Sequence, residues 1–481
     1  MMPNRKSLLL PLLLLLHAVS SAQLQPVGQW RDHLPYHQAI AVTQQQSIVW
    51  CATPFSIFSV DPSDYSIERF SRISGLSETG IGAIGADPDG NKLVIAYTNS
   101  NIDVLQQNTV HNIDAIRNST ISGNKNINHI YVQQQRALLS SGLGIILLNL
   151  EKYEVSDTWI IGNNGSRIEV YNTVADAQFY YAATEEGLKR APVNANNLAD
   201  YRNWEMLSGT DGLPAGSVRA VVLSGNQIFV QWNNQLFTRQ NNSWNSFYND
   251  GWEIRGLRAS GNKLLLTEQN GSQARVVSLT NAGVVENIIQ HSAFTAAPRQ
   301  AIWFQQQYWI ADAGKGLSAS DGAGNFESFV PPSPAAVASG QMQVLHNTLW
   351  IASGGVTPNW EPANNRNGLY RFRDDNWTNV NAASGNLPDS INDIVSVAID
   401  PVDQSIWAGS FDDGLLHIQD GQPVSVFKQN SPIQPAYFST GSYRVSGLNF
   451  DASGNLWLSN YGSPGELVVR KPDGNFKSFT I

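Results

Sequence analysis

The sequence predicts an all-β fold, a seven-bladed β-propeller followed by part of a second β-propeller. A strand motif recurs ten times at the period of a propeller blade, and a Pro-rich break follows its seventh copy. Only 14% of the residues are charged, whereas about a quarter is usual in globular chains. Gly, Asn and aromatic residues take their place, which favours strands and tight turns over helices.

The recurring motif is a short apolar strand that ends in small residues. Its copies cover residues 48–53, 93–97, 137–142, 180–184, 228–232, 264–267, 308–312, 349–353, 406–410 and 456–460. Successive copies lie about 35 to 57 residues apart, mostly near 45, as expected for blades of four strands. Gly-Asn turns precede several copies, and alternating strands follow them, so each unit reads as one twisted antiparallel sheet.

The break at residues 331–334, Pro-Pro-Ser-Pro, separates seven copies from three. We therefore expect a seven-bladed propeller over residues 23–332 and the first three blades of a second, incomplete propeller over residues 333–481. Three blades alone would leave apolar sheet faces uncovered, so we expect the sequence to be incomplete. Two alternatives remain open: ten blades divided differently, or a partner that supplies the missing blades.

The first 22 residues have the pattern of a secretory signal peptide. Arg5 and Lys6 precede a leucine-rich run over residues 8–16, and Ser20-Ser21-Ala22 offers a cleavage site. The chain is therefore expected to be exported. Cys51 is the single cysteine, lies in an apolar strand and is expected to be a buried, unreactive side chain. The net charge of −9, without a basic cluster, argues against a nucleic-acid partner.

No catalytic motif stands out, and we expect the protein not to be an enzyme. Nucleophile-elbow, zinc-protease and phosphate-loop patterns do not occur, and the His33 and His37 pair lacks further metal ligands. Acidic turns at residues 87–91, 321–325 and 451–455 resemble calcium loops, but each is placed where a hairpin must turn. We expect no cofactor, with structural calcium as the alternative.

The best candidate for a contact site is the loop over residues 357–367, the longest insertion in the repeat. Insertions of this kind lie on a propeller face, which is often the binding face. Its candidate residues are Trp360, Glu361, Asn364 and Arg366. Asp412 and Asp413 are further candidates, which could reach a propeller face and hold a cation or a sugar. Tryptophans of the repeated strand are expected to pack between blades, whereas Trp204, Trp232, Trp244 and Trp252 could lie on a face and stack on sugar rings.

Several strings resemble the PorZ proteins of the type IX secretion system. They cover residues 27–36, 75–77, 96–104, 125–128, 144–154, 157–162 and 182–187, and beyond about residue 335 the units resemble two-component-regulator propeller repeats. The resemblance implies two seven-bladed propellers and a C-terminal β-sandwich, which is absent here. It also implies that the protein crosses the periplasm and is located at the outer-membrane surface of the cell. There it would belong to an attachment complex with the sortase-like PorU, the barrel protein PorV and PorQ.

The function that the resemblance implies is that of a non-catalytic scaffold that assists delivery of anionic lipopolysaccharide to the sortase for anchoring of secreted cargo. Lipopolysaccharide handling is linked to the domain that is absent here. The alternative is the extracellular, glycan-sensing propeller region of a two-component regulator. A propeller enzyme is a third hypothesis, but it would need carboxylates that converge on one site.

Overall fold

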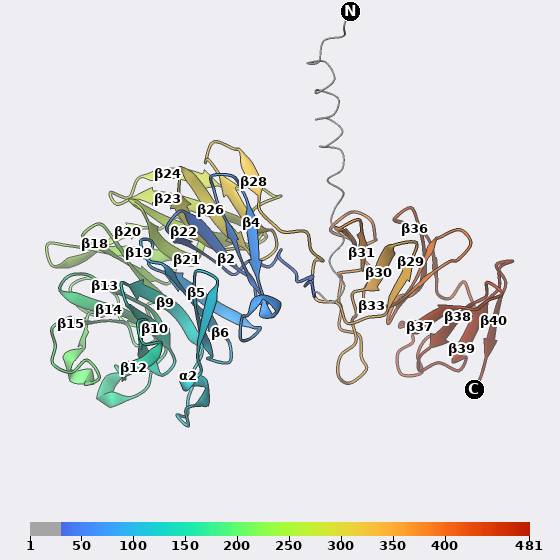
Figure 1. Cartoon of the computed structure of the whole chain (residues 1–481), viewed down its shortest axis with the longest axis horizontal. Coiled ribbons are helices and arrows are strands. Elements are labelled where there is room, and N and C mark those ends of the chain that lie inside the picture. The colour runs from blue at the N-terminus through green and yellow to red at the C-terminus, as the bar shows by residue number, and fades with distance from the viewer. Residues whose placement is uncertain (1–29) are drawn as a thin grey trace, which may run out of the picture. The chain divides into compact units, whose positions relative to one another are not determined.

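A computed structural model describes residues 30–481 of the chain (Figure 1). The chain divides into two units, Met1–Asp32 and His33–Ile481, and every strand described below belongs to the second unit. The predicted signal peptide lies outside the described residues. Within the described part, no helix combines the length and the apolar character that a membrane crossing would require.

The second unit contains ten antiparallel sheets, each built from four strands that are consecutive in the chain. We call these sheets blades 1 to 10. Blades 1 to 3 consist of β1 (Ala41–Gln45), β2 (Ile48–Ala52), β3 (Ile57–Val60), β4 (Ile67–Phe70), β5 (Ile81–Ala86), β6 (Lys92–Tyr97), β7 (Ile102–Gln106), β8 (Thr109–Ile113), β9 (Ile127–Gln133), β10 (Arg136–Ser141), β11 (Gly144–Asn149) and β12 (Glu154–Trp159).

Blades 4 to 7 consist of β13 (Val170–Ala175), β14 (Phe179–Thr184), β15 (Leu188–Pro192), β16 (Glu205–Met206), β17 (Ala220–Ser224), β18 (Gln227–Trp232), β19 (Gln235–Gln240), β20 (Ser243–Tyr248), β21 (Glu253–Ser260), β22 (Lys263–Asn270), β23 (Gln273–Thr280), β24 (Val285–Ile289), β25 (Pro298–Phe304), β26 (Gln307–Asp312), β27 (Gly316–Ser320) and β28 (Phe326–Ser328). Short helices lie in the connections at η1 (Arg72–Ser74), α2 (Ala115–Asn118), η2 (Asn163–Gly165) and η3 (Tyr201–Asn203).

Blades 8 to 10 consist of β29 (Met342–Leu345), β30 (Thr348–Ala352), β31 (Leu369–Arg373), β32 (Asn376–Val380), β33 (Ile394–Ile399), β34 (Ile406–Ser410), β35 (Gly414–Gln419), β36 (Gln422–Phe427), β37 (Val445–Phe450), β38 (Leu456–Asn460), β39 (Leu467–Arg470) and β40 (Phe476–Phe479). The fold is therefore the predicted one, a seven-bladed propeller followed by part of a second.

Each copy of the sequence motif is the second strand of its blade, buried on both faces by the neighbouring strands and blades. A polar residue at or just after the end of this strand caps the hairpin that follows. Thr53 accepts hydrogen bonds from the amides of Phe55 and Ser56, and Ser410 does the same for Asp412 and Asp413. The small residues of the motif thus close a turn whose backbone groups would otherwise lack partners.

The first propeller closes by side-chain packing between blade 1 and blade 7. Val49, Cys51 and Phe58 of blade 1 share one buried cluster with Trp309 and Leu317 of blade 7. Because every blade uses four consecutive strands, no strand is exchanged across this seam within the described residues. The ring is therefore closed by apolar packing at its seam together with hydrogen bonds, such as that from the Ala39 amide to the Asp312 carbonyl oxygen at 3.2 Å. Burial raises the pKa of the Cys51 thiol, as expected of an unreactive core residue.

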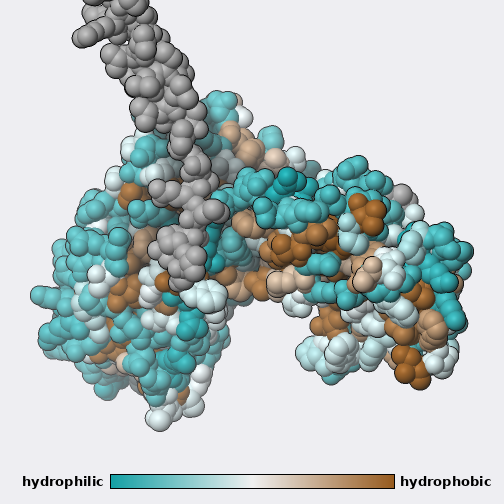
Figure 2. Space-filling model, turned by 45° about the vertical axis from the view of Figure 1, so that its right-hand side comes forward, coloured by the Kyte–Doolittle hydropathy of each residue, from teal (hydrophilic) through white to brown (hydrophobic). Residues whose placement is uncertain are grey.

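Blades 8 to 10 pack on one another through two further cores. Trp350, Val397 and Ile406 join blades 8 and 9, and Trp407 and Leu458 join blades 9 and 10. Apolar side chains also reach the surface of this part of the chain (Figure 2), among them Met342 and Val344 on the first strand of blade 8.

Candidate functional site

The predicted loop lies between β30 and β31 of blade 8, and it meets the hairpins of blades 9 and 10 on one propeller face. The hairpins between the second and third strands, and the connections between blades, all open on this face, which we call the loop face. Trp360 stacks on Tyr461 of the blade 10 hairpin, with 5.6 Å between ring centroids and planes 22° apart. Both rings also contact Phe411 of the blade 9 hairpin.

Arg444 is the centre of this group, although its side chain is almost completely buried. Its guanidinium lies 5.1 Å from the ring centre of Phe411 and 4.7 Å from that of Phe438. Its nitrogens donate hydrogen bonds to the Trp360 carbonyl oxygen at 3.0 Å and to the Glu361 carboxylate at 2.6 Å. We call Trp360, Phe411, Phe438 and Tyr461, together with Arg444, the aromatic cluster.

A glycine lets Phe438 reach this position. Gly462 has a φ of 68°, and a Cβ atom there would lie 2.9 Å from Cζ of Phe438. The amide of Tyr437 donates to the Gly462 carbonyl oxygen at 2.7 Å, which holds the connection before blade 10 against the hairpin. Phe438 thus lies across the Arg444 guanidinium, and a larger residue at position 462 would displace it.

The other predicted site residues have mainly structural contacts. Asp413 is buried, accepts from the Asn392 amide at 2.8 Å and forms an ion pair with Lys428 at 2.7 Å. The carbonyl oxygen of Asp412 accepts from the Tyr443 amide at 2.8 Å. Asn364 and Arg366 are exposed on the loop. The structure therefore brings Trp360 and Glu361 together at Arg444, and gives Asp413 a role within the fold.

Sequence reasoning missed Asp393, a completely buried residue just before β33. Its carboxylate accepts from the amides of Asn364 and Asn365 at 3.1 and 2.7 Å, so it anchors the predicted loop from below. Burial raises the pKa of Asp393, and the negative charges of Asp412 and Asp413 add to this effect. Its loop contacts lie 28 and 29 residues away in the sequence, which leaves no local motif to detect.

The remaining predicted tryptophans occupy different environments. Trp204 and Trp244 are buried between blades and cannot stack on a ligand, whereas Trp232 and Trp252 are partly exposed. His33 and His37, which are close in the sequence, contact different partners. His33 accepts a hydrogen bond from the Trp377 indole at 3.1 Å, and His37 contacts Ser333 at 3.4 Å.

The acidic turns use their carboxylates within the turn. Asp451 accepts from the amides of Ser453 and Asn455, both at 2.9 Å, and Asp321 holds its own turn in the same way. In residues 30–481, no three His, Cys, Asp or Glu side chains are grouped so that they could hold a metal ion. These contacts support the interpretation of the acidic segments as hairpin turns.

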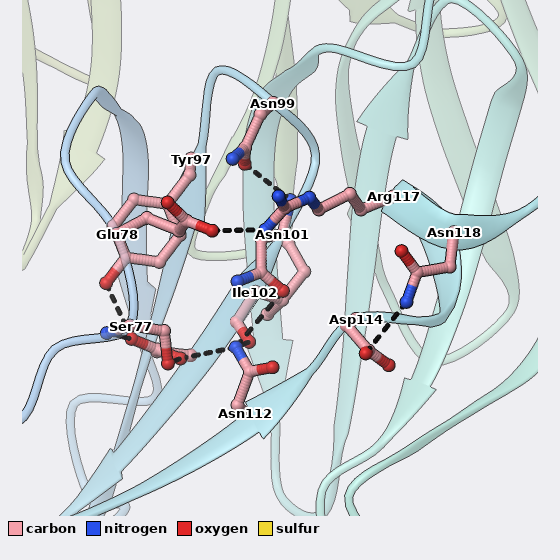
Figure 3. Close-up of polar contacts among 11 residues, drawn as sticks. Ser77, Glu78, Tyr97, Asn99, Asn101, Ile102, Asn112, Asp114, Arg117 and Asn118 are labelled. Carbon is pink, nitrogen blue, oxygen red and sulfur yellow. Dashed lines mark hydrogen bonds and ion pairs between the residues drawn. The ribbon is translucent and has the colours of Figure 1, made fainter.

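A polar network in blade 2 joins two of the strings that resemble PorZ (Figure 3). Asp103 on β7 is completely buried, and its carboxylate accepts hydrogen bonds from Ser77, Tyr97 and Asn112. Burial and the Asp103 carboxylate raise the pKa of Tyr97. Glu78 and Arg117 form an ion pair beside it. The network fixes the 71–80 connection onto blade 2.

A cavity of about 280 Å³ lies between the turns of blades 2 and 3, lined by Asp87, Lys92, Val132 and Gln135 among others. The ammonium group of Lys92 in its lining already has partners within the protein, because it donates hydrogen bonds to the Leu150 carbonyl oxygen at 2.6 Å and to Gln135 at 3.0 Å. The aromatic cluster is therefore the stronger candidate site.

Comparison with known structures confirms the fold. The described architecture is similar to PorZ of Porphyromonas gingivalis, with a TM-score of 0.79, 21% sequence identity, and coverage of 94% of this chain and 60% of that one. The chain thus spans less than two thirds of the PorZ structure. An ancestral GH74 enzyme is similar with a TM-score of 0.61 at 11% identity, covering 93% of this chain and 69% of that one.

The extracellular domain of a protein described as a hybrid two-component system of B. thetaiotaomicron aligns with a TM-score of 0.45 at 14% identity, covering 94% of this chain and 67% of that one. No curated protein sequence matches the chain. Residues 49–205 match the family described as the N-terminal β-propeller domain of PorZ in the type IX secretion system. The resemblance of the N-terminal propeller to PorZ, predicted from its sequence strings, is therefore confirmed.

Proposed function

We propose that the protein is a non-catalytic scaffold and binding component of the type IX secretion system. The observation that carries this proposal is the match of residues 49–205 to the PorZ N-terminal propeller. The P. gingivalis protein of similar fold is described as an essential bacterial surface component of that system. The polar network around Asp103 supports the proposal, because strings that resemble PorZ in sequence also meet in space.

We propose further that the protein acts with a sortase-like peptidase, a barrel protein and a third component of the kinds named PorU, PorV and PorQ. Its role there would be to assist delivery of anionic lipopolysaccharide for anchoring of secreted cargo. Export by the predicted signal peptide at residues 1–22 would bring it through the periplasm to the outer-membrane surface. Residues 23–332 and 333–481 are the two propeller regions that we assign to it.

The experiment is affinity capture of the full-length tagged protein from its native cells, followed by mass spectrometry. An unrelated exported protein with the same tag is the control. Recovery of the sortase-like peptidase and the barrel protein, enriched over the control, is the expected result. Surface exposure is checked by adding protease to intact cells, which should cleave the protein while periplasmic markers stay intact.

A different result would overturn the proposal. If none of these partners is enriched and the protein fractionates with the inner membrane, the sensor hypothesis replaces it. Deletion of the gene gives an independent readout, because loss of a secretion component should cause cargo proteins to accumulate inside the outer membrane.

A further inference from the structure

Exposed aromatic side chains gather on the loop face of blades 8 to 10. Six large aromatic residues of the described chain are exposed: Trp30, Tyr65, Trp360, Tyr437, Phe438 and Tyr461. Trp360, Phe438 and Tyr461 belong to the aromatic cluster, and Tyr437 directly precedes Phe438. The exposed fractions of Trp360 and Phe438 are 55% and 60%. Four of these six aromatic residues therefore lie on one face, and exposed apolar side chains that gather in this way are typical of an interaction site.

The backbone holds Trp360 outward at a conformational cost. Its φ is 58°, in the left-handed region where Gly or Asn is favoured and a bulky side chain is strained. The conformation persists because the surrounding turn fixes it. Thr357 accepts from the amide of Trp360 at 2.9 Å and from that of Glu361 at 3.1 Å, while Arg444 binds the Trp360 carbonyl oxygen. Strain that is held in this way is typical of binding sites.

The cluster carries no unpaired charge. Arg444 has only 2% of its surface exposed, and its guanidinium is paired with Glu361. The ligand-facing surface therefore consists of aromatic rings, not of a cation. A strongly anionic segment would gain little from such a surface, whereas a neutral molecule with an apolar face would fit it.

We propose that the aromatic cluster binds pyranose rings of a polysaccharide, with Trp360 and Phe438 as the stacking surfaces. A pyranose ring has an apolar face of C–H groups, which an aromatic ring can cover, and hydroxyl groups around its edge. Asn359, Asn364 and Thr440 are exposed polar residues within four positions of Trp360 or Phe438 in the sequence, and side chains of this kind can bond those hydroxyls.

This proposal rests on the residues of the cluster and does not require the secretion role. It is tested by native affinity electrophoresis of the purified full chain in gels that contain soluble yeast mannan, or polysaccharide released by mild acid from the lipopolysaccharide of the source cells. Retardation in at least one of the two gels is expected. Binding to both indicates recognition of pyranose rings in general, and binding to the second alone indicates the cell's own polysaccharide.

The Trp360→Asn variant is the most informative one, because Asn tolerates the left-handed backbone and should preserve the fold while it removes the ring. It and Phe438→Ala should each weaken binding at least 10-fold. Tyr65→Ala is the matched control, an exposed aromatic residue of blade 1, 44% exposed, whose loss should leave binding unchanged.

Absence of retardation in both gels would overturn the proposal, as would binding that Trp360→Asn and Phe438→Ala leave within 2-fold of the original. If these variants instead abolish self-association or capture of a protein partner, the cluster is a protein interface and the proposal is wrong. Failure of the secretion role would appear differently, as absence of type IX components from the affinity capture while retardation persists.

Discussion

The buried carboxylate of Asp103 allows a quantitative prediction about how the first propeller is held together. It accepts four hydrogen bonds: from the Ser77 amide at 2.8 Å, the Ser77 hydroxyl at 2.7 Å, the Tyr97 hydroxyl at 2.6 Å and the Asn112 amide nitrogen at 2.8 Å. Hydrogen bonds to a charged group contribute roughly 1.5–3 kcal/mol each, and the desolvation of a buried charge costs several kcal/mol in return.

We therefore expect Asp103→Ala to lower the free energy of unfolding of the first propeller by about 3–5 kcal/mol, because it leaves buried donors without an acceptor. Asp103→Asn keeps one acceptor oxygen and should cost about 1–2 kcal/mol. Guanidinium unfolding followed by tryptophan fluorescence measures the loss. Hydrogen exchange of the Ser77 amide reports it locally, and exchange should become faster in both variants.

Asp64→Ala is the control, since this exposed aspartate makes only local contacts, such as that with the Ser66 amide, and its loss should leave the unfolding midpoint unchanged. If Asp103→Ala loses less than about 1 kcal/mol and exchange at Ser77 is unaffected, the network does not anchor the 71–80 connection and this reasoning is wrong.

Three further predictions follow from the core and the turns. Burial and the charge of Arg258 lower the pKa of His129 to about 3. As the pH falls, His129 is therefore protonated in the unfolded chain at a higher pH than in the folded chain. The free energy of unfolding should fall as the pH drops from 6.5 towards 3, by up to about 1.4 kcal/mol per pH unit. The His129→Asn variant should lack this pH dependence, which unfolding midpoints measured across the range would show. Gly414→Ala should destabilise blade 9 strongly in thermal unfolding, because its Cβ would lie 2.3 Å from the Phe427 carbonyl oxygen at a φ of 83°, whereas Gly421→Ala, at a similar φ with open space, should cost much less. Trp309→Ala should cost about 3–5 kcal/mol, measured by denaturant unfolding, since it removes a completely buried ring from the seam; a loss below about 1 kcal/mol would show that the seam does not depend on it.

The repeat was visible in the sequence because its signal is local. Alternation of apolar residues and the Gly-Asn turns fall within a few residues of each strand, so the sequence predicts all ten copies as strands. The structure shows that each copy is the second strand of its blade. The loop position of Trp360 could be predicted for a similar reason, since the longest insertion in the repeat must leave the sheet.

The rest of the site depends on contacts that no local pattern encodes. Arg444 meets its partners 83 and 84 residues away, and it precedes an apolar strand without any motif. Trp204 and Trp244 show the opposite difficulty, because their sequence neighbours are polar and yet the rings are buried between blades. Whether an aromatic residue outside the repeated strand faces solvent or a neighbouring blade is decided by the fold, and periodicity does not reveal it.

The packed seam between blades 1 and 7 determines which blade closes the propeller against blade 1. Ten blades share one sequence pattern, and a ring closed by strand exchange would mark its last blade through backbone pairing. Here closure relies on packed side chains such as Phe58 and Trp309 and on hydrogen bonds such as that from the Ala39 amide to the Asp312 carbonyl oxygen. The folding chain must therefore reject closure onto blade 6 or blade 8 through the fit of these side chains and hydrogen bonds, and mismatched closure is the characteristic misfolding risk of such an array.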